Sequence, residues 1–257
     1  MDKRRRIKMQ GVDYRYRLFW WNIGVTCVHW TSFIALMVIS FTRLDRTQRV
    51  HLWFDAGYGQ AIPRSLGSYP LFATLVPFPF LTGCFHVMAA LNVDQYYHGT
   101  LKLGMNRLRW VEYAITNGLM TWSLCVLVGA GSILVPILCV FSNFVMQSFG
   151  WFHERRNHGV TRAARSLTPL LLGFIPWIVT WATILSYWSV NGGNVAKALA
   201  VWGTFVWSLG FVAPLLWRYK QPNMIKHNYN MEMAYMILSL SAKLWLDWTL
   251  VIGNLVE

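Results

Sequence analysis

The chain has 257 residues, of which 55% are hydrophobic and only 13% are charged. Soluble domains carry about 25% charged residues, and a chain this apolar will bury surface, which excludes a disordered protein. The formal net charge is nevertheless +13, from 23 Lys and Arg against 10 Asp and Glu. These basic residues lie in clusters between long apolar runs, whereas a nucleic-acid-binding domain interleaves them along a folded surface. The pattern therefore indicates a membrane protein with no nucleic-acid partner.

Seven apolar runs are long enough to cross a bilayer, which takes about 20 mostly apolar residues. They predict an all-α fold, a seven-transmembrane-helix bundle that forms one multi-pass membrane domain over residues 1–257. Residues 1–17 form a basic tail and residues 43–69 the longest loop, in which Gly57-Tyr58-Gly59 favours a short hairpin. The predicted spans are Leu18–Thr42, Pro70–Val93, Leu108–Val128, Ser132–Phe152, Thr168–Val190, Ala196–Trp217 and Asn230–Leu255.

Taken in chain order, the first run is too long for the apolar region of a signal peptide, so we expect it to be retained. The second run contains Pro77 and Pro79, which usually kink a membrane helix. Gly129-Ala130-Gly131 predicts a tight turn between the third and fourth runs. The four cysteines fall within apolar runs and are expected to be buried free thiols.

The orientation of the bundle follows from the distribution of Lys and Arg. Seventeen of the 23 basic residues precede the first run or lie in the second, fourth and sixth loops, on the N-terminal side of the membrane. Five lie on the opposite side, and Lys243 lies within the seventh run. Because cytoplasmic loops carry the excess of positive charge, we predict a cytoplasmic N-terminus, an extracellular C-terminus and an extracellular 43–69 loop. The basic tail is expected to meet anionic lipid head groups.

Ionisable groups at bilayer depth cost several kcal/mol and are candidate functional residues. Lys243 lies near the middle of the last run and Glu112 in the first turns of the third. One interpretation is a structural ion pair between Lys243 and Glu112 or Asp247. Another is covalent, because a desolvated lysine forms a Schiff base with an aldehyde, and its protonated form needs a nearby carboxylate. A third is proton coupling in a transporter.

Three further sites have less specific interpretations. Asp247 lies four residues after Lys243 on the same helix face. It is a second acceptor, a residue in an outward-facing cavity or, as we slightly favour, an interfacial residue on the extracellular side. Glu232, at the start of the seventh run, is expected to contact water. The segment His153–His158 superficially resembles a zinc helix, but its histidines are five residues apart where HExxH needs four. We therefore expect a solvated basic loop and no metal site.

The chain resembles the heliorhodopsins, the inverted branch of the microbial rhodopsins. Arg109-Trp110-Val111-Glu112-Tyr113-Ala114-Ile115 is similar to the third-helix signature around the counterion of that family. Ser239-Leu240-Ser241-Ala242-Lys243 is similar to its retinal-lysine segment. The cytoplasmic N-terminus predicted from charge is the topology that distinguishes the family. The length and all seven runs fit, so the resemblance covers nearly the whole chain.

This resemblance implies a role for each matching residue. Lys243 would hold all-trans retinal as a protonated Schiff base, with Glu112 as counterion, Tyr113 beside it and Ser239 hydrogen-bonding nearby. A polar network in the cytoplasmic half would contain His29, His86, Thr82 and Asn106. The apolar slot that the polyene needs would be lined by Trp207 and Phe211, with Met120, Phe144, Met146 and Trp177 as further candidates.

The resemblance further implies a photoreceptor rather than an enzyme, with a homodimer and an unknown cytoplasmic signalling partner. A proton pump needs carboxylates on both sides of the Schiff base. Two positions that carry carboxylates in outward pumps hold Ser123, eleven residues after Glu112, and Ser239, four before Lys243. We therefore expect a non-pumping light sensor. The alternatives are a light-gated proton or ion conductance, lined in part by Asp247 and Glu232, and a retinal-free transporter with a Lys–Glu pair.

Overall fold

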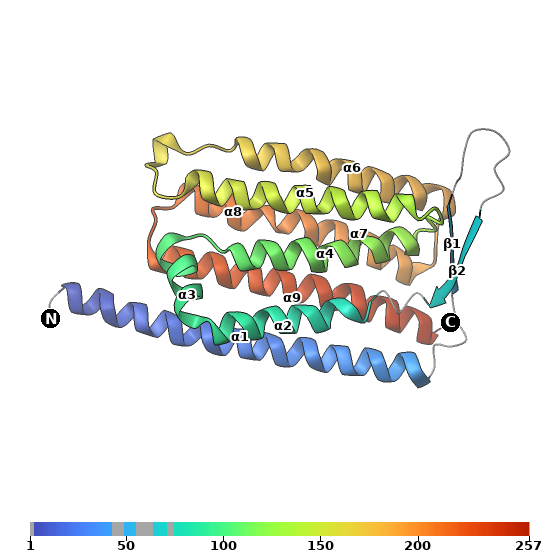
Figure 1. Cartoon of the computed structure of the whole chain (residues 1–257), viewed down its shortest axis with the longest axis horizontal. Coiled ribbons are helices and arrows are strands. Elements are labelled where there is room, and N and C mark those ends of the chain that lie inside the picture. The colour runs from blue at the N-terminus through green and yellow to red at the C-terminus, as the bar shows by residue number, and fades with distance from the viewer. Residues whose placement is uncertain (1–2, 43–48, 55–63, 71–74, 257) are drawn as a thin grey trace.

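A computed structural model describes residues 3–42, 49–54, 64–70 and 75–256. Long helices lie side by side, and the two termini lie at opposite ends of the bundle (Figure 1). We call these the N-terminal end, where α1 begins, and the C-terminal end, where α9 ends. The helices are α1 (Lys3–Thr42), α2 (Pro77–Leu91), α3 (Val93–Tyr97), α4 (Arg107–Leu127), α5 (Leu134–Asn157), α6 (Thr168–Asn191), α7 (Val195–Gly210), α8 (Val212–Lys220) and α9 (Ile225–Val256), with a π-helical turn at His98–Leu103 and a 3-10 turn at Arg162–Ala164.

Each predicted apolar run lies largely within helix, which confirms a helical membrane-type fold. Five stretches are long and apolar enough to cross a membrane. The apolar helix α2 has only 15 residues, and α4 carries three charged residues in its first turns, so the count of seven spans stays a prediction. The five stretches are Asp13–Phe41, Leu134–Asn157, Thr168–Asn191, Val195–Lys220 and Ile225–Ile252.

The long loop contains a hairpin, as predicted. Strand β1 (Arg49–Phe54) pairs antiparallel with β2 (Arg64–Pro70), with Arg49 opposite Pro70. The hairpin lies at the C-terminal end of the bundle (Figure 1). The predicted turn at Gly57-Tyr58-Gly59 lies outside the described residues.

Three local predictions need correction. The basic segment predicted as a tail continues α1, which is helical from Lys3, because most of its residues are good helix formers. Pro77 and Pro79 do not kink α2; they lie in its first turn, where a missing backbone N–H costs no helical hydrogen bond. The sixth run is divided at Phe211 into α7 and α8, because Pro214 cannot donate a hydrogen bond to the carbonyl of Gly210.

The core has two parts that matter for the site. At the C-terminal end, apolar side chains of α1, α2, α4 and α9 form one cluster that includes Leu36, Phe78, Leu246 and Leu250. Nearer the N-terminal end, α4 and α5 approach closely because the Trp110 ring occupies the space where a side chain on Gly150 would stand. Helix α9 packs against α1, α7 and α8. This arrangement encloses the middle of α9.

Candidate functional site

The centre of the bundle contains a buried ion pair. Nζ of Lys243, in the middle of α9, donates a hydrogen bond to Oε1 of Glu112 on α4 at 2.7 Å. Lys243 is 1% exposed and Glu112 is 5% exposed. The Tyr113 ring lies 5.5 Å from the same Nζ, and the Tyr113 hydroxyl donates to the backbone carbonyl of Tyr235 at 3.1 Å. Helices α4 and α9 are therefore joined at the position where the sequence placed the lysine and its carboxylate partner.

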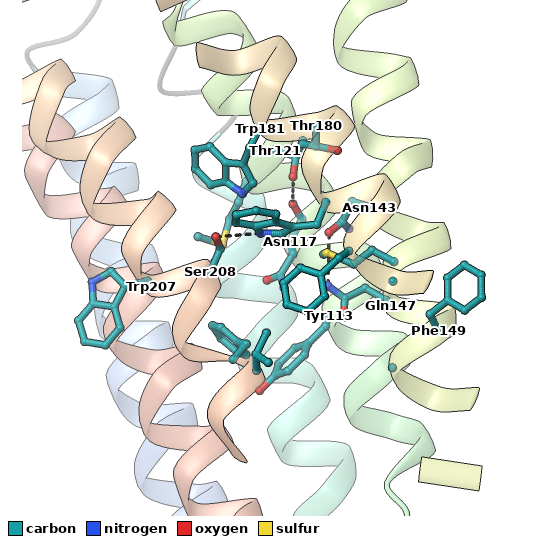
Figure 2. Close-up of a pocket in the computed structure, with 18 of the residues that line it drawn as sticks. Tyr113, Asn117, Thr121, Asn143, Gln147, Phe149, Thr180, Trp181, Trp207 and Ser208 are labelled. Carbon is teal, nitrogen blue, oxygen red and sulfur yellow. Dashed lines mark hydrogen bonds between the residues drawn. The ribbon is translucent and has the colours of Figure 1, made fainter. Parts of the chain in front are cut away.

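A cavity lies beside this pair between α4, α5, α6, α7 and α9 (Figure 2). Its wall includes Ala242, the neighbour of Lys243 in the chain. Aromatic and apolar side chains dominate the lining. Its polar members are the amides of Asn117, Asn143 and Gln147 and the hydroxyls of four Ser and Thr side chains. Of the residues predicted for the slot, Met120, Met146, Trp177, Trp207 and Phe211 line the cavity. Phe144 is not among the lining residues and is 40% exposed.

The sequence-predicted polar residues surround the pair from α1, α2 and α9. Nδ1 of His86 donates to Oδ1 of Asn22 at 2.7 Å, and the His86 ring stacks with that of His29 at 6.3 Å between centroids. His29, Thr82 and Ser239 are buried, and their side-chain nitrogens and hydroxyls make no hydrogen bond within the described part of the chain. These groups retain donors and acceptors for a bound group or for one another after a conformational change.

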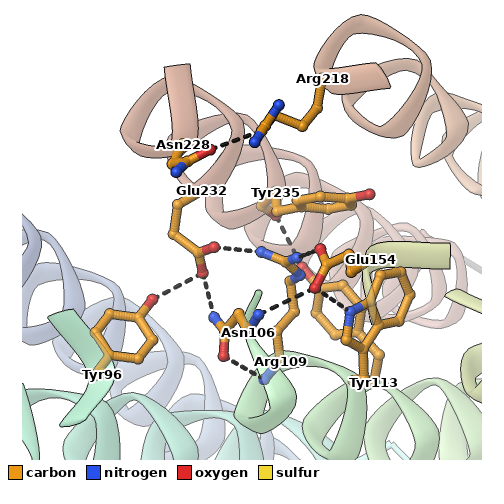
Figure 3. A network of polar contacts seen from close by, with 10 residues as sticks. Tyr96, Asn106, Arg109, Tyr113, Glu154, Arg218, Asn228, Glu232 and Tyr235 are labelled. Carbon is orange, nitrogen blue, oxygen red and sulfur yellow. Dashed lines mark hydrogen bonds and ion pairs between the residues drawn. The ribbon is translucent and has the colours of Figure 1, made fainter. Parts of the chain in front are cut away.

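A second buried charge cluster lies at the N-terminal end (Figure 3). The Arg109 guanidinium, at the start of α4, pairs with Glu154 of α5 and Glu232 of α9. Asn106 donates through its backbone N–H to Glu154 at 3.0 Å and through Nδ2 to Glu232 at 2.6 Å. The Tyr96 hydroxyl donates to Glu232 at 2.8 Å. Both carboxylates are therefore held by several donors each.

Tyr96 lies outside the long helices, on α3. Its burial, together with the negative charge of Glu232, raises the pKa of Tyr96 well above its usual value. The hydroxyl therefore keeps its proton and acts as a donor to the carboxylate. A small polar cavity joins this cluster to the central pair, because its lining includes His86, Asn106, Glu112 and Glu232.

The structure corrects three expectations about charged residues. Glu232 was expected to contact water but is 2% exposed. Glu154, expected in a solvated loop, lies in the last turns of α5 and is buried. Asp247 was expected at the interface but has no exposed surface, and neither carboxylate oxygen makes a hydrogen bond within the described residues.

Sequence reasoning missed the partnership of Arg109 with Glu154, although a signal was present. The buried residues of α5 recur every three or four positions and continue past the end of the predicted run. Extending that period would have placed Glu154 on the inner face. The series is Cys139, Asn143, Gln147, Gly150 and Glu154.

A family model described as Heliorhodopsin matches residues 18–255. The chain belongs to the heliorhodopsin family. Among solved structures, the chain is similar to one titled "Crystal structure of thermophilic rhodopsin", with a TM-score of 0.64 and 12% identity over 95% of this chain and 96% of that one. At this identity the likeness shows a rhodopsin-like fold. No relative was found among curated protein sequences. Family and fold support a retinal-binding, light-sensing membrane protein.

Proposed function

We propose that this heliorhodopsin-family chain is a light sensor that holds all-trans retinal on Lys243, with Glu112 as the counterion, and that it does not pump ions. The observation that carries the proposal is the 2.7 Å contact between Nζ of Lys243 and Glu112 beside an aromatic cavity. A buried ammonium without a carboxylate would be too costly to form. Glu112 therefore stabilises the positive charge on Nζ in the dark.

The residues of this chain fit retinal. An aldehyde chromophore needs a buried primary amine next to a long apolar slot, and the cavity wall reaches Ala242 beside Lys243. Lys243 is already desolvated, and Glu112 holds its amine in one position. When bound, retinal supplies visible-light absorption and a light-driven change of shape. Met120 and Trp181, from α4 and α6, would confine it laterally.

Two hydroxyl side chains of α4 support a sensor rather than a pump. The Thr116 hydroxyl donates to the backbone carbonyl of Glu112 at 3.0 Å, and the Ser123 hydroxyl donates to that of Leu119 at 3.0 Å. Both bonds lie within α4, so these side chains stabilise helix backbone. A hydroxyl at these positions cannot store a negative charge as a carboxylate does. Nζ of Lys243 therefore loses its proton to Glu112 or to the polar groups around it.

The orientation and the partners belong to the same proposal. The excess of Lys and Arg at the N-terminal end supports a cytoplasmic N-terminus. The basic first turns of α1 would contact anionic lipid, and the cytoplasmic end would present the signal to a partner protein. A homodimer is proposed from the family.

The test is an absorption spectrum of the purified chain after addition of all-trans retinal. We expect a visible band that hydroxylamine bleaches faster in light than in darkness. The Lys243→Ala variant should lack the band, whereas Lys197→Ala, at the start of α7, should keep it. A wild-type chain that gives no visible band would overturn the proposal and favour a retinal-free transporter with a Lys–Glu pair.

A light-gated conductance is the second candidate, and one observation favours it. The small cavity that joins His86 and Glu112 to Glu232 gives the N-terminal half a polar interior. Voltage-clamp recording under illumination separates the two functions. We expect no photocurrent that reverses with voltage, because the apolar cluster around Leu36 and Leu250 closes the other half. A reversible, voltage-dependent photocurrent would establish the conductance.

A further inference from the structure

Asp247 is a second carboxyl group beside Lys243. It lies one turn further along α9, toward the C-terminal end, and has no exposed surface. The charge of Lys243 acts on it, and the Ser32 side chain of α1 lies within interaction range. Neither Asp247 oxygen makes a hydrogen bond of normal geometry among the described residues. The proposed function leaves this carboxyl group without a role.

The surroundings of Asp247 are polar on the side that faces Lys243. Four inward-facing polar residues of α1 are spaced three or four positions apart and are buried. The charge of Lys243 also acts on His29, whose ring nitrogens have no partner within the described chain. Titratable side chains of α1, α2, α4 and α9 therefore lie around Lys243 and Asp247. The polar residues of α1 are Asn22, Thr26, His29 and Ser32.

The side of Asp247 that faces the C-terminal end is apolar. Leu36 follows Ser32 by one turn of α1, and Leu250 and Val251 follow Asp247 by about one turn of α9. These three residues belong to one buried cluster with Leu75 and Phe78. Within the described residues, this layer separates Asp247 from the C-terminal end. A proton on Asp247 can therefore exchange with Lys243 more readily than with water beyond the layer.

The charge balance assigns different protonation states to the two carboxyl groups. Lys243 carries one positive charge, and Glu112 compensates it at 2.7 Å. A second carboxylate in the same enclosed site would be a buried charge that makes no hydrogen bond of normal geometry among the described residues, which is unfavourable. The balanced state therefore has one ammonium on Lys243, one carboxylate and one carboxylic acid. Asp247 is the acid, because its oxygens make no hydrogen bond of normal geometry among the described residues, whereas Glu112 accepts one from Lys243.

We propose that Asp247 is an alternate counterion of Lys243, a carboxylic acid in the dark that becomes the carboxylate partner of Nζ after illumination. The inference rests on the proposed function, because light must first move the proton of Nζ to Glu112. Asp247, next to the Ser32 side chain, then gives its proton from Oδ to Nζ. The number of protons in the site is unchanged, and the negative charge moves from Glu112 to Asp247. Return of both protons restores the dark state.

Infrared difference spectroscopy on the full chain loaded with all-trans retinal tests this exchange. In the wild type, illumination should remove the carbonyl band of one protonated carboxylic acid, Asp247, and create another, that of Glu112. Asp247→Asn should lack the lost band and reprotonate Nζ about 10²-fold more slowly or worse. Asp247→Glu should restore both, and Ser32→Ala should shift the frequency of the Asp247 band. The matched control is Asp94→Asn, which changes an exposed carboxyl group paired with Arg15 and should leave both bands intact.

The outcomes separate the two proposals. A chain without any visible band overturns the proposed function and this inference together. A normal visible band with an unchanged carbonyl pattern in Asp247→Asn overturns the inference alone. A dark visible band that Asp247→Asn shifts as strongly as Glu112→Gln also overturns it, because Asp247 would then be ionised in the dark.

Discussion

At the residue scale, the central feature is an ammonium that is stable at membrane depth only because of its partner. Lys243 has almost no exposed surface, and its hydrogen bond to Glu112 replaces the water that burial removes. Removing one member of a buried pair is costly because the other charge stays behind. The behaviour of the chromophore should therefore depend on Glu112 more than on any other neighbour of the amine.

Glu112→Gln should change the visible band strongly. The loss of the carboxylate removes about 3–5 kcal/mol of stabilisation from the buried cation, which lowers the ratio of its protonated to its neutral form by at least about 100-fold. The dark visible band should be replaced by near-ultraviolet absorption and should return when small anions are added. An absorption titration with chloride checks this. A variant with the wild-type spectrum in the absence of added anions would contradict the assignment of Glu112.

The sequence predicts Lys243 and Glu112 and offers Asp247 as a second acceptor, but it does not predict the burial of Asp247. A charged side chain within an apolar run is visible in any sequence, so the sequence alone indicates Lys243 and Glu112. The sequence also places Asp247 on the same helix face as Lys243. It does not show that Leu36 and Leu250, far apart in the chain, close over Asp247. That burial depends on how α1 packs against α9.

At the element scale, Arg109 fastens three helices at the N-terminal end. It lies at the start of α4, and its partners lie at the end of α5 and the start of α9. The guanidinium also lies over the Tyr235 ring, 4.1 Å from its centroid. A planar group with five donors can bind two carboxylates at once, which a lysine cannot do in the same geometry. Any light-driven shift of α9 against α4 must therefore act on this cluster.

Arg109→Gln should destabilise the bundle by about 3–5 kcal/mol, because Glu154 and Glu232 would remain buried without their cation. Arg109→Lys should recover only part of the loss. Thermal unfolding followed by circular dichroism measures the effect. Arg107→Gln is the control, since Arg107 belongs to the same first turn but is exposed. Equal stability of Arg109→Gln and Arg107→Gln would show that the cluster does not hold the helices together.

The sequence predicted most elements, and its failures have physical causes. The apolar runs predict the long helices, because a helix that is buried in lipid or protein must carry apolar side chains. Pro214 divides the sixth run and Pro77 begins α2, and the effect of a proline depends on whether it lies inside a helix or in its first turn. The contact between Arg109 and Glu154 depends on the packing of α4 against α5, which the sequence does not show. The same limit applies to the small polar cavity, which residues of α1, α2, α3, α4 and α9 build together.

At the scale of the whole molecule, the net charge of +13 is divided between two ends. The helices place the termini at opposite ends of the bundle (Figure 1). The basic residues gather at the N-terminal end, which contains the Arg109 cluster and the polar cavity. If a partner reads the light signal, the asymmetry favours this end as the surface it contacts.

The proposed orientation predicts which terminus is accessible in intact cells. An epitope tag placed before Met1 should be protected from an external protease, and a tag placed after Glu257 should be cleaved. Immunoblots of intact and permeabilised cells measure both, with permeabilised cells as the control in which either tag is cleaved. Cleavage of the N-terminal tag in intact cells would contradict the proposed orientation. It would show that the N-terminus and the Arg109 cluster lie on the extracellular side.

The most direct test of the account is to locate the chromophore on the chain. The retinal-loaded protein is reduced with borohydride, which makes the lysine linkage permanent, then digested and analysed by peptide mass spectrometry. The account predicts a retinyl adduct on the peptide that contains Lys243 and none on the peptide that contains Lys197. A chain that carries its adduct on another lysine, or that shows a visible band with Lys243 unmodified, would contradict it.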